Sequence, residues 1–227
     1  MPTKYDSPRG RAHRFGTTGG GLRVLFGSLL LLLVLFPVLN QELVGRSIFA
    51  LLSTAVLFWG AYTVSRDRRR LVIALLLAVP ALAARWSFVF LRTPAAHGAA
   101  LATSIAFYSY TLLLILDYVL QTDEVTANEI FGAVCVYILT GFVWGMGFAM
   151  LNLFSPSAIK NMNGAMQTGD FFYFSFTTLT TVAYGDMYPV SPVARSMAIV
   201  EAMVGVIFVA VFISRLIGLH AGRSRRT

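Results

Sequence analysis

Long apolar runs alternate with short polar or basic stretches along most of the chain. The six longest runs cover residues 22–39, 47–65, 71–91, 99–120, 129–151 and 193–219. A helix needs about 20 mostly apolar residues to cross the hydrocarbon core of a bilayer. The pattern therefore predicts six transmembrane helices. A basic stretch before the first run also fits a signal peptide, but Asn40-Gln41-Glu42 follows that run in place of a small-residue cleavage site, so we expect a retained span.

A seventh apolar stretch, residues 170–182, is too short to cross a membrane. As a helix it would measure roughly 20 Å, which is typical of a re-entrant segment. Thr168 or Asp170 is expected to cap its first turn, where Asp170 would also lie at the positive end of the helix dipole. Beyond it the chain must return to the surface as irregular backbone. Such backbone is tolerated at membrane depth only when it is buried in protein or lines a water-filled path.

The composition supports an integral membrane protein. Hydrophobic residues make up 57% of the chain and charged residues 12%, whereas soluble domains average about 25% charged residues. The net charge of +8 comes from clusters that separate the apolar runs, as in cytoplasmic loops, which argues against a nucleic-acid partner. The clusters are Lys4, Arg9, Arg11 and Arg14, then Arg66 with Arg68, Arg69 and Arg70, and finally Arg223, Arg225 and Arg226.

These clusters predict where the chain lies and how it is divided. We expect a multi-pass protein of the cell's inner (plasma) membrane, in contact with lipid, with both termini cytoplasmic. Residues 1–21 read as a disordered basic tail and residues 220–227 as a short basic tail. The acidic linker 121–128 is expected to separate a four-helix front part, 22–120, from a two-helix pore domain, 129–219.

The front part lacks the charges of a voltage sensor. Sensors carry arginine at every third position of the fourth span, but residues 99–120 contain neither arginine nor lysine, and their one charge is Asp117. In the third run, Arg85 is expected in the outer half of the membrane, reaching toward the lipid headgroups. Because Asp117 should lie near the inner surface, we expect no pair between it and Arg85.

The irregular return segment contains the residues with a chemical function. Carbonyl groups of Thr181, Val182, Ala183 and Tyr184, together with the Thr181 hydroxyl, could replace the water shell of a monovalent cation if they face a water-filled path. No cluster of metal-ligating residues and no catalytic constellation is seen. We therefore expect neither an enzyme nor a resident cofactor, and we interpret the segment as a binding site for permeant ions.

The segment Thr180–Asp186 resembles the signature of the potassium channel superfamily, whose usual filter reads Thr-Val-Gly-Tyr-Gly-Asp. The front spans match, by count, bacterial six-span channels that do not sense voltage. The resemblance implies an all-α membrane fold with an outer helix (129–151), a pore helix (169–180), a filter (181–186) that includes Gly185, and an inner helix (193–219). It also implies a homotetramer that passively conducts potassium ions.

One filter position departs from the family. Ala183 stands where the family has a glycine in a left-handed conformation, and an L-residue there costs roughly 1–2 kcal/mol. Three outcomes remain open: a potassium-selective channel, a weakly selective cation channel, and a poorly conducting or regulatory subunit. A secondary transporter is a more distant alternative, because such proteins tend to show internal repeats and paired broken helices.

Residues next to the filter are candidates for supporting it or for attracting cations to its mouth. Thr180 and Asp186 flank the filter, and four copies of Asp186 would concentrate cations there. The pore helix offers no carboxylate near its end to bond Asp186. Tyr173 and Phe174 are candidates for an aromatic cuff around the filter, with lipid-facing side chains as the alternative.

Two residues of the inner helix also need an explanation. Glu201 is an intramembrane carboxylate, which is a functional candidate by default. It could face the ion path or bond Thr177, Thr178 or a backbone group behind the filter. Gly205 is either a gating hinge, as the resemblance implies, or a site of close helix packing.

Overall fold

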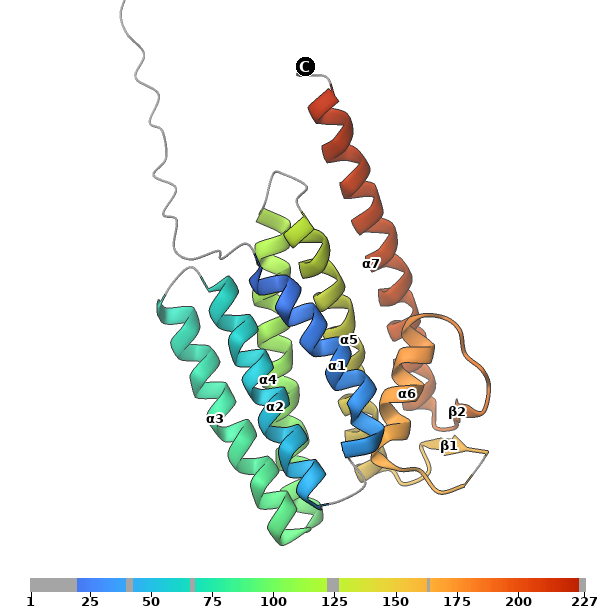
Figure 1. The fold of residues 1–227 in the computed structure, drawn as a ribbon. Coiled ribbons are helices and arrows are strands. Elements are labelled where there is room, and N and C mark those ends of the chain that lie inside the picture. Colours follow the sequence, from blue (N-terminus) through green and yellow to red (C-terminus); the bar gives the residue numbers. More distant parts are fainter. Residues whose placement is uncertain (1–19, 40–42, 66–67, 122–126, 163, 225–227) are drawn as a thin grey trace, which may run out of the picture.

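The computed structural model describes residues 20–39, 43–65, 68–121, 127–162 and 164–224. The N-terminal tail predicted for residues 1–21 lies almost entirely outside them. Within the described residues the chain forms seven helices and two short strands (Figure 1). In chain order they are α1 (Gly21–Leu39), α2 (Leu43–Val64), α3 (Arg68–Leu91), α4 (Pro94–Gln121), α5 (Ala127–Phe154), β1 (Ile159–Asn161), α6 (Thr168–Leu179), β2 (Met187–Pro189) and α7 (Pro192–Ser224).

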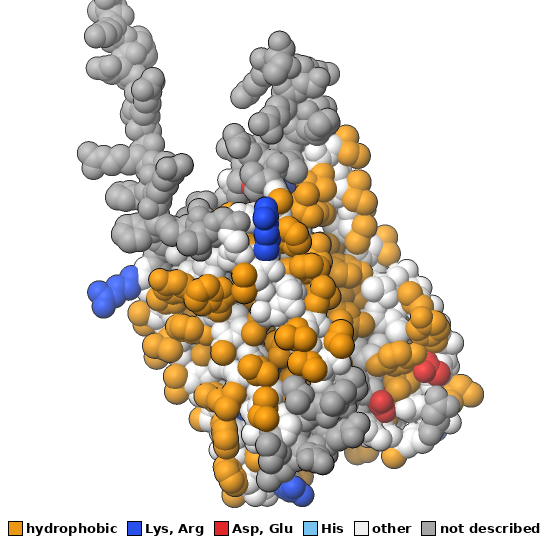
Figure 2. Space-filling model, viewed as in Figure 1, with side chains coloured by type: hydrophobic (Ala, Val, Ile, Leu, Met, Phe, Trp, Pro, Cys, Tyr) orange, Lys and Arg blue, Asp and Glu red, His pale blue; other side chains and the backbone are white. Residues whose placement is uncertain are grey.

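Four of the described helices are long and apolar enough to cross a membrane, namely α3, α4, α5 and the Pro192–Ile217 part of α7. Helices α1 and α2 contribute the shorter apolar segments Gly21–Phe36 and Ser47–Thr63. Hydrophobic side chains cover much of the face in Figure 2, and the Lys and Arg side chains in view lie toward the two ends of the bundle. The fold is that of a multi-pass membrane protein, while the count of six spans stays a prediction.

Several boundaries differ from those predicted. Helix α7 continues to Ser224 and so includes part of the stretch interpreted as a tail, and α5 takes in Ala127 and Asn128 of the presumed linker. Polar residues can extend a helix beyond its apolar run, because its backbone hydrogen bonds do not depend on hydropathy. The all-α prediction also missed β1 and β2, which pair as a small antiparallel sheet.

The front helices and α5 share one core. Leu25 of α1, Ile115 of α4 and Leu139 and Phe142 of α5 are all buried in the same cluster. Helices α1–α4 and α5 therefore stand side by side, and most of α7 lies to one side of them (Figure 1). Helix α6 packs on α5 and also contacts α1, where the Phe172 and Phe36 rings lie 4.9 Å apart. The acidic linker marks a break in the sequence, but the packing continues across it.

Three helix ends gather at one end of the bundle. The first residue of α1, the start of α3 and the last turns of α7 lie at the same end of the molecule (Figure 1). At this end Nη2 of Arg215 donates to the Leu120 carbonyl 2.9 Å away, which joins α7 to the end of α4. Of the predicted basic clusters, Arg68, Arg69 and Arg70 begin α3 and Arg223 lies in the last turn of α7. Which side of a membrane this end faces stays a prediction.

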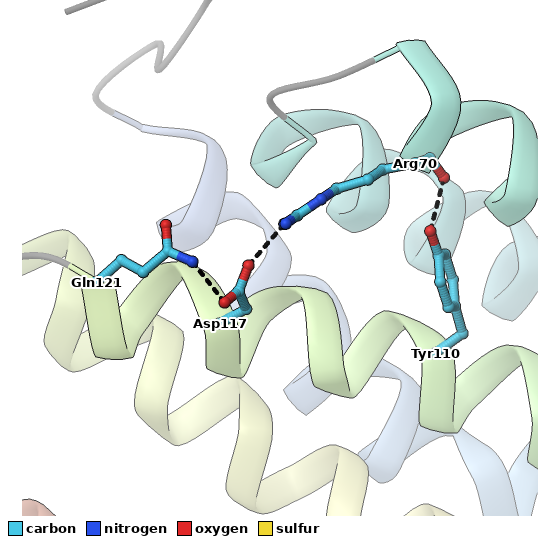
Figure 3. A network of polar contacts seen from close by, with 4 residues as sticks. All are labelled: Arg70, Tyr110, Asp117 and Gln121. Carbon is cyan, nitrogen blue, oxygen red and sulfur yellow. Dashed lines mark hydrogen bonds and ion pairs between the residues drawn. The ribbon is translucent and has the colours of Figure 1, made fainter.

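Asp117, the charge in the fourth span, is held by a polar network between α3 and α4 (Figure 3). Its carboxylate accepts hydrogen bonds from Arg70 at 2.6 Å and from Gln121 at 2.5 Å. The Tyr110 hydroxyl donates to the Arg70 carbonyl at 3.0 Å. Because α3 and α4 are antiparallel, the start of one lies beside the end of the other. The expectation that Asp117 does not pair with Arg85 is confirmed.

Arg85 turns into the bundle. Its Nε donates to Ser104 Oγ at 3.0 Å and its Nη1 donates to Ser53 Oγ at 2.8 Å. The guanidinium carbon also lies 5.8 Å from the centre of the Tyr108 ring. The predicted reach toward the headgroups is wrong, because two buried hydroxyls on α2 and α4 offer acceptors inside the protein.

Candidate functional site

Helix α6 is anchored at its first turn. Its N-cap is Gln167, whose backbone N–H donates to Asp170 Oδ2 at 2.9 Å. Asn161 Nδ2 donates to the same oxygen at 3.1 Å, which ties α6 to β1. Thr168 is the first helical residue and not a cap, whereas Asp170 does help to cap the helix, because its side chain completes a capping box from the third helical position. The position of Asp170 near the positive end of the helix dipole agrees with the prediction.

The chain folds back against the end of α6 after Leu179, one residue earlier than predicted. Thr180 is the C-cap residue, the Thr181 N–H donates to the Thr178 carbonyl at 2.9 Å, and the Ala183 N–H donates to the Thr177 carbonyl at 3.1 Å. From Thr181 to Asp186 the chain forms neither helix nor strand. It is held there by the last turn of α6 rather than by a regular ladder.

The backbone of this segment alternates in handedness. Thr181, Ala183 and Gly185 have positive φ values of 60°, 42° and 86°, whereas Val182 and Tyr184 between them do not. The left-handed conformation that the resemblance implied for Ala183 is confirmed. For Thr181 and Ala183 this conformation costs roughly 1–2 kcal/mol each, because the β-carbon crowds the following carbonyl. Strain of this kind persists where the surrounding structure holds it, often at functional sites.

Asp186 is bonded to the pore helix after all. Its Oδ2 accepts a hydrogen bond from the Tyr173 hydroxyl at 3.0 Å, and the Tyr173 ring stacks on Tyr184 with centroids 6.3 Å apart. Its backbone carbonyl accepts from the Met162 N–H at 2.9 Å. Sequence reasoning looked for a carboxylate partner and missed the phenol. A tyrosine two turns before the end of α6 was the available signal.

Phe174 takes no part in a cuff around the filter. It is buried, and its ring meets Phe148 of α5 edge-on at 4.9 Å. Consecutive helical residues point in directions about 100° apart, so when Tyr173 faces the filter Phe174 faces α5. The prediction is wrong for Phe174, while Tyr173 does contact the filter.

Strands β1 and β2 join the segment before α6 to the segment that follows Asp186. They pair antiparallel, with Ile159 opposite Pro189 and Asn161 opposite Met187. The Ala158 carbonyl extends the contact by accepting from the Val190 N–H at 2.8 Å. The segments before α6 and after the filter are thus joined directly. Strands of three residues carry too short an alternation to be predicted from sequence.

Glu201 lies behind the filter and is fully buried. Its Oε1 lies 2.5 Å from Ser175 Oγ, and that hydroxyl also lies 2.8 Å from the Gly141 carbonyl. The predicted bond to the pore helix is present, but its partner is Ser175, because the Thr177 hydroxyl bonds its own helix at Tyr173. A serine hydroxyl has one proton to donate. Both contacts are hydrogen bonds at once only if the Glu201 carboxyl also carries a proton.

Gly205 lies against the end of the pore helix. A β-carbon at this position would come within 2.0 Å of the Leu179 carbonyl oxygen. The Tyr137 hydroxyl donates to the same oxygen at 3.0 Å. Helix α7 runs unbroken through Gly205. Of the two interpretations, the geometry favours close packing.

A family model described as ion channel matches residues 130–219, which run from α5 through α6 and the filter segment to α7. Residues 130–219 are an ion-channel domain of the potassium channel superfamily. The predicted membership is confirmed, and this family is one of ion channels and not of enzymes. No curated protein and no solved structure matches the chain. Helices α1–α4 lie outside the match.

The surface of the ion-channel domain is unusually apolar in the single chain. The Val182 and Tyr184 side chains of the filter segment are 52% and 72% exposed. Along α7 many large aliphatic side chains are exposed too, among them Ile199, Met203 and Ile207. An apolar surface of this extent marks a region that contacts other protein or lipid.

Proposed function

We propose that four copies of this chain form a passive cation channel selective for potassium ions, with Thr181–Gly185 as its filter. The alternating backbone of this segment, inside an ion-channel domain, is the observation that carries the proposal. In a strand, successive carbonyls point to opposite sides. Alternating handedness instead lets successive carbonyls turn to one side, where rings of them can replace the water shell of an ion.

The neighbouring elements support the same role. Helix α6 ends at the filter, so the negative end of its dipole faces the position proposed for the ion. Thr180 and Asp186 stand at the two ends of the filter, and Glu201 supports it from behind through Ser175. Permeant ions are the substrate of this site, and the proposal includes no resident cofactor.

A homotetramer accounts for the exposed surfaces. One chain supplies one quarter of each carbonyl ring, so a filter needs partners around a common axis. Burial of the exposed filter side chains and of the apolar face of α7 against neighbouring copies and lipid would remove them from water. Native mass spectrometry of the solubilised protein tests this assembly: we expect four chains, and a monomer or dimer would contradict it.

The geometry of Ala183 favours a second candidate, a weakly selective cation channel. At a φ of 42° its backbone is strained, and four copies would repeat the strain around one ring. If the carbonyl turns away, that ring is widened. A flux assay in proteoliposomes under potassium and then under sodium gradients separates the candidates. Gly185→Ala, at φ 86°, is expected to abolish both fluxes.

We further propose that the chain lies in the plasma membrane with both termini cytoplasmic, and that α1–α4 do not sense voltage. The basic end of the bundle and the absence of arginine and lysine from residues 99–120 support these points. In planar bilayers with the same salt on both sides, we expect the conductance to be the same at positive and at negative voltages.

A further inference from the structure

A cavity of about 300 Å³ lies between the front helices and the pore helix. Its walls are mostly aromatic and aliphatic, with Phe36 from α1, Phe49 from α2 and Phe172 from α6. Its charged lining residues are Arg85, inside the bundle, and Arg92, which is exposed just after α3. Among the described residues that line it, none is acidic. The site thus combines an apolar cavity with positive charge.

Arg85 keeps hydrogen-bonding capacity for a ligand. A guanidinium group has five N–H donors, and its hydrogen bonds with the described residues use one on Nε toward Ser104 and one on Nη1 toward Ser53. Both partners are neutral, and among the described residues Arg85 has no ion pair. The two serines fix the orientation of the group, which also lies 5.8 Å from the centre of the Tyr108 ring, while its charge has no anionic partner among the described residues. Partly buried charges are normally paired, so this one favours an anion.

We propose that the cavity binds a single-chain amphiphile with a carboxylate head, of the fatty-acid class. The carboxylate would take the free N–H groups of Arg85, since a guanidinium fork matches the two oxygens of a carboxylate. The alkyl chain would lie along the phenylalanine walls. The volume is at the lower end of that of small-molecule pockets, which suits one chain better than a two-chain lipid.

An occupant of this cavity would touch the pore helix directly. Thr168 and Phe172 of α6 form part of its wall, opposite Arg85 of α3. The stacked pair Phe88 and His97, with ring centroids 4.4 Å apart, borders the same space. The binding inference does not depend on the proposed conduction, because it rests on the cavity and on Arg85 alone.

Direct binding of dodecanoate to the full chain in nanodiscs of neutral lipid tests the inference, with native mass spectrometry as the readout. Loss of a charge-assisted pair should weaken binding at least about tenfold in Arg85→Gln. Arg69→Gln is the matched control, because it removes an exposed cation from the same helix, α3, outside the lining of the cavity, and it should bind within about twofold of wild type. Ala100→Phe keeps Arg85 but fills the buried wall of the cavity, and should also lose binding.

Comparison of different ligands on the wild-type protein identifies the preferred head group even if a variant fails to fold. Dodecanol and dodecylamine should bind at least about tenfold more weakly than dodecanoate. Equal binding of dodecanol and dodecanoate would overturn the proposal, as would unchanged binding to Arg85→Gln. Tighter binding of dodecyl phosphate than of dodecanoate would overturn the carboxylate assignment and indicate a phosphate headgroup.

Discussion

Gly205 of α7 and the Leu179 carbonyl of α6 meet with no side chain between them. A β-carbon added at Gly205 would lie only 2.0 Å from that carbonyl oxygen, which is far closer than two such atoms can approach. The inner helix therefore contacts the last turn of the pore helix through bare backbone, directly before the filter begins. This contact sets the position of α6, so the glycine is a packing requirement whether or not α7 also bends there.

Gly205→Ala is therefore expected to destabilise the protein. Overpacking of this kind typically costs about 1–3 kcal/mol, and here the obstacle is backbone, which cannot rotate away. We expect a lower thermal unfolding midpoint for the detergent-solubilised protein. Gly27→Ala in α1 is the matched control, because nothing lies within 4 Å of a β-carbon there, and it should be neutral or slightly stabilising. If both variants unfold at the wild-type temperature, the packing account of Gly205 is wrong.

Ser175→Ala should lower the stability of the protein more than Glu201→Gln does. The alanine removes the hydroxyl that bonds the fully buried Glu201 carboxyl, which costs about 1–3 kcal/mol. Glutamine keeps the shape and supplies an amide donor to Ser175, which can then donate to Gly141. Thermal unfolding of both variants measures the difference.

The control for that pair is Ser214→Ala, an exposed serine of α7 that bonds its own helix at Ala210. It should change the free energy of unfolding by less than about 0.5 kcal/mol. A Ser175→Ala protein as stable as this control would show that the short contact with Glu201 contributes little.

Tyr173→Phe should loosen the filter without unfolding the protein. It removes the hydrogen bond to Asp186 but keeps the ring stacked on Tyr184. One such bond contributes about 0.5–1.5 kcal/mol net, so we expect the potassium-to-sodium permeability ratio to fall by up to about tenfold. Tyr188→Phe, whose exposed phenol forms no hydrogen bond with the described residues, should leave the ratio unchanged. Equal permeability ratios in the Tyr173→Phe and Tyr188→Phe variants would show that the Tyr173 hydroxyl does not support the filter.

Sequence reasoning recovered the parts of the fold that depend on hydropathy. The apolar runs predicted the six longer helices and the short pore helix to within a few residues, because the bilayer requires long apolar segments. The proposed filter, Thr181 to Asp186, is a prediction from consecutive residues and so needed no tertiary information. The positive φ at Ala183 followed from that resemblance.

The remaining contacts depend on which helix faces which. Arg85 points inward because Ser53 and Ser104 happen to face it from two other helices. Glu201 bonds Ser175 and not the neighbouring threonines because of the rotation of α6. The packing of α5 against the front helices was hidden by an acidic linker that looked like a domain boundary. None of these is a property of one segment, so no single-segment pattern could predict them.

The most direct test of the central claim is a reversal potential for the purified wild-type protein in planar bilayers under opposed potassium and sodium gradients. We expect a value near the potassium equilibrium potential, with Ala183→Gly, which relieves the strain at φ 42°, at least as selective. A wild-type value near zero that moves to the potassium potential in Ala183→Gly would locate weak selectivity in that ring. No current from either protein, or a reversal potential near zero for both, would contradict a potassium-selective filter at residues 181–185.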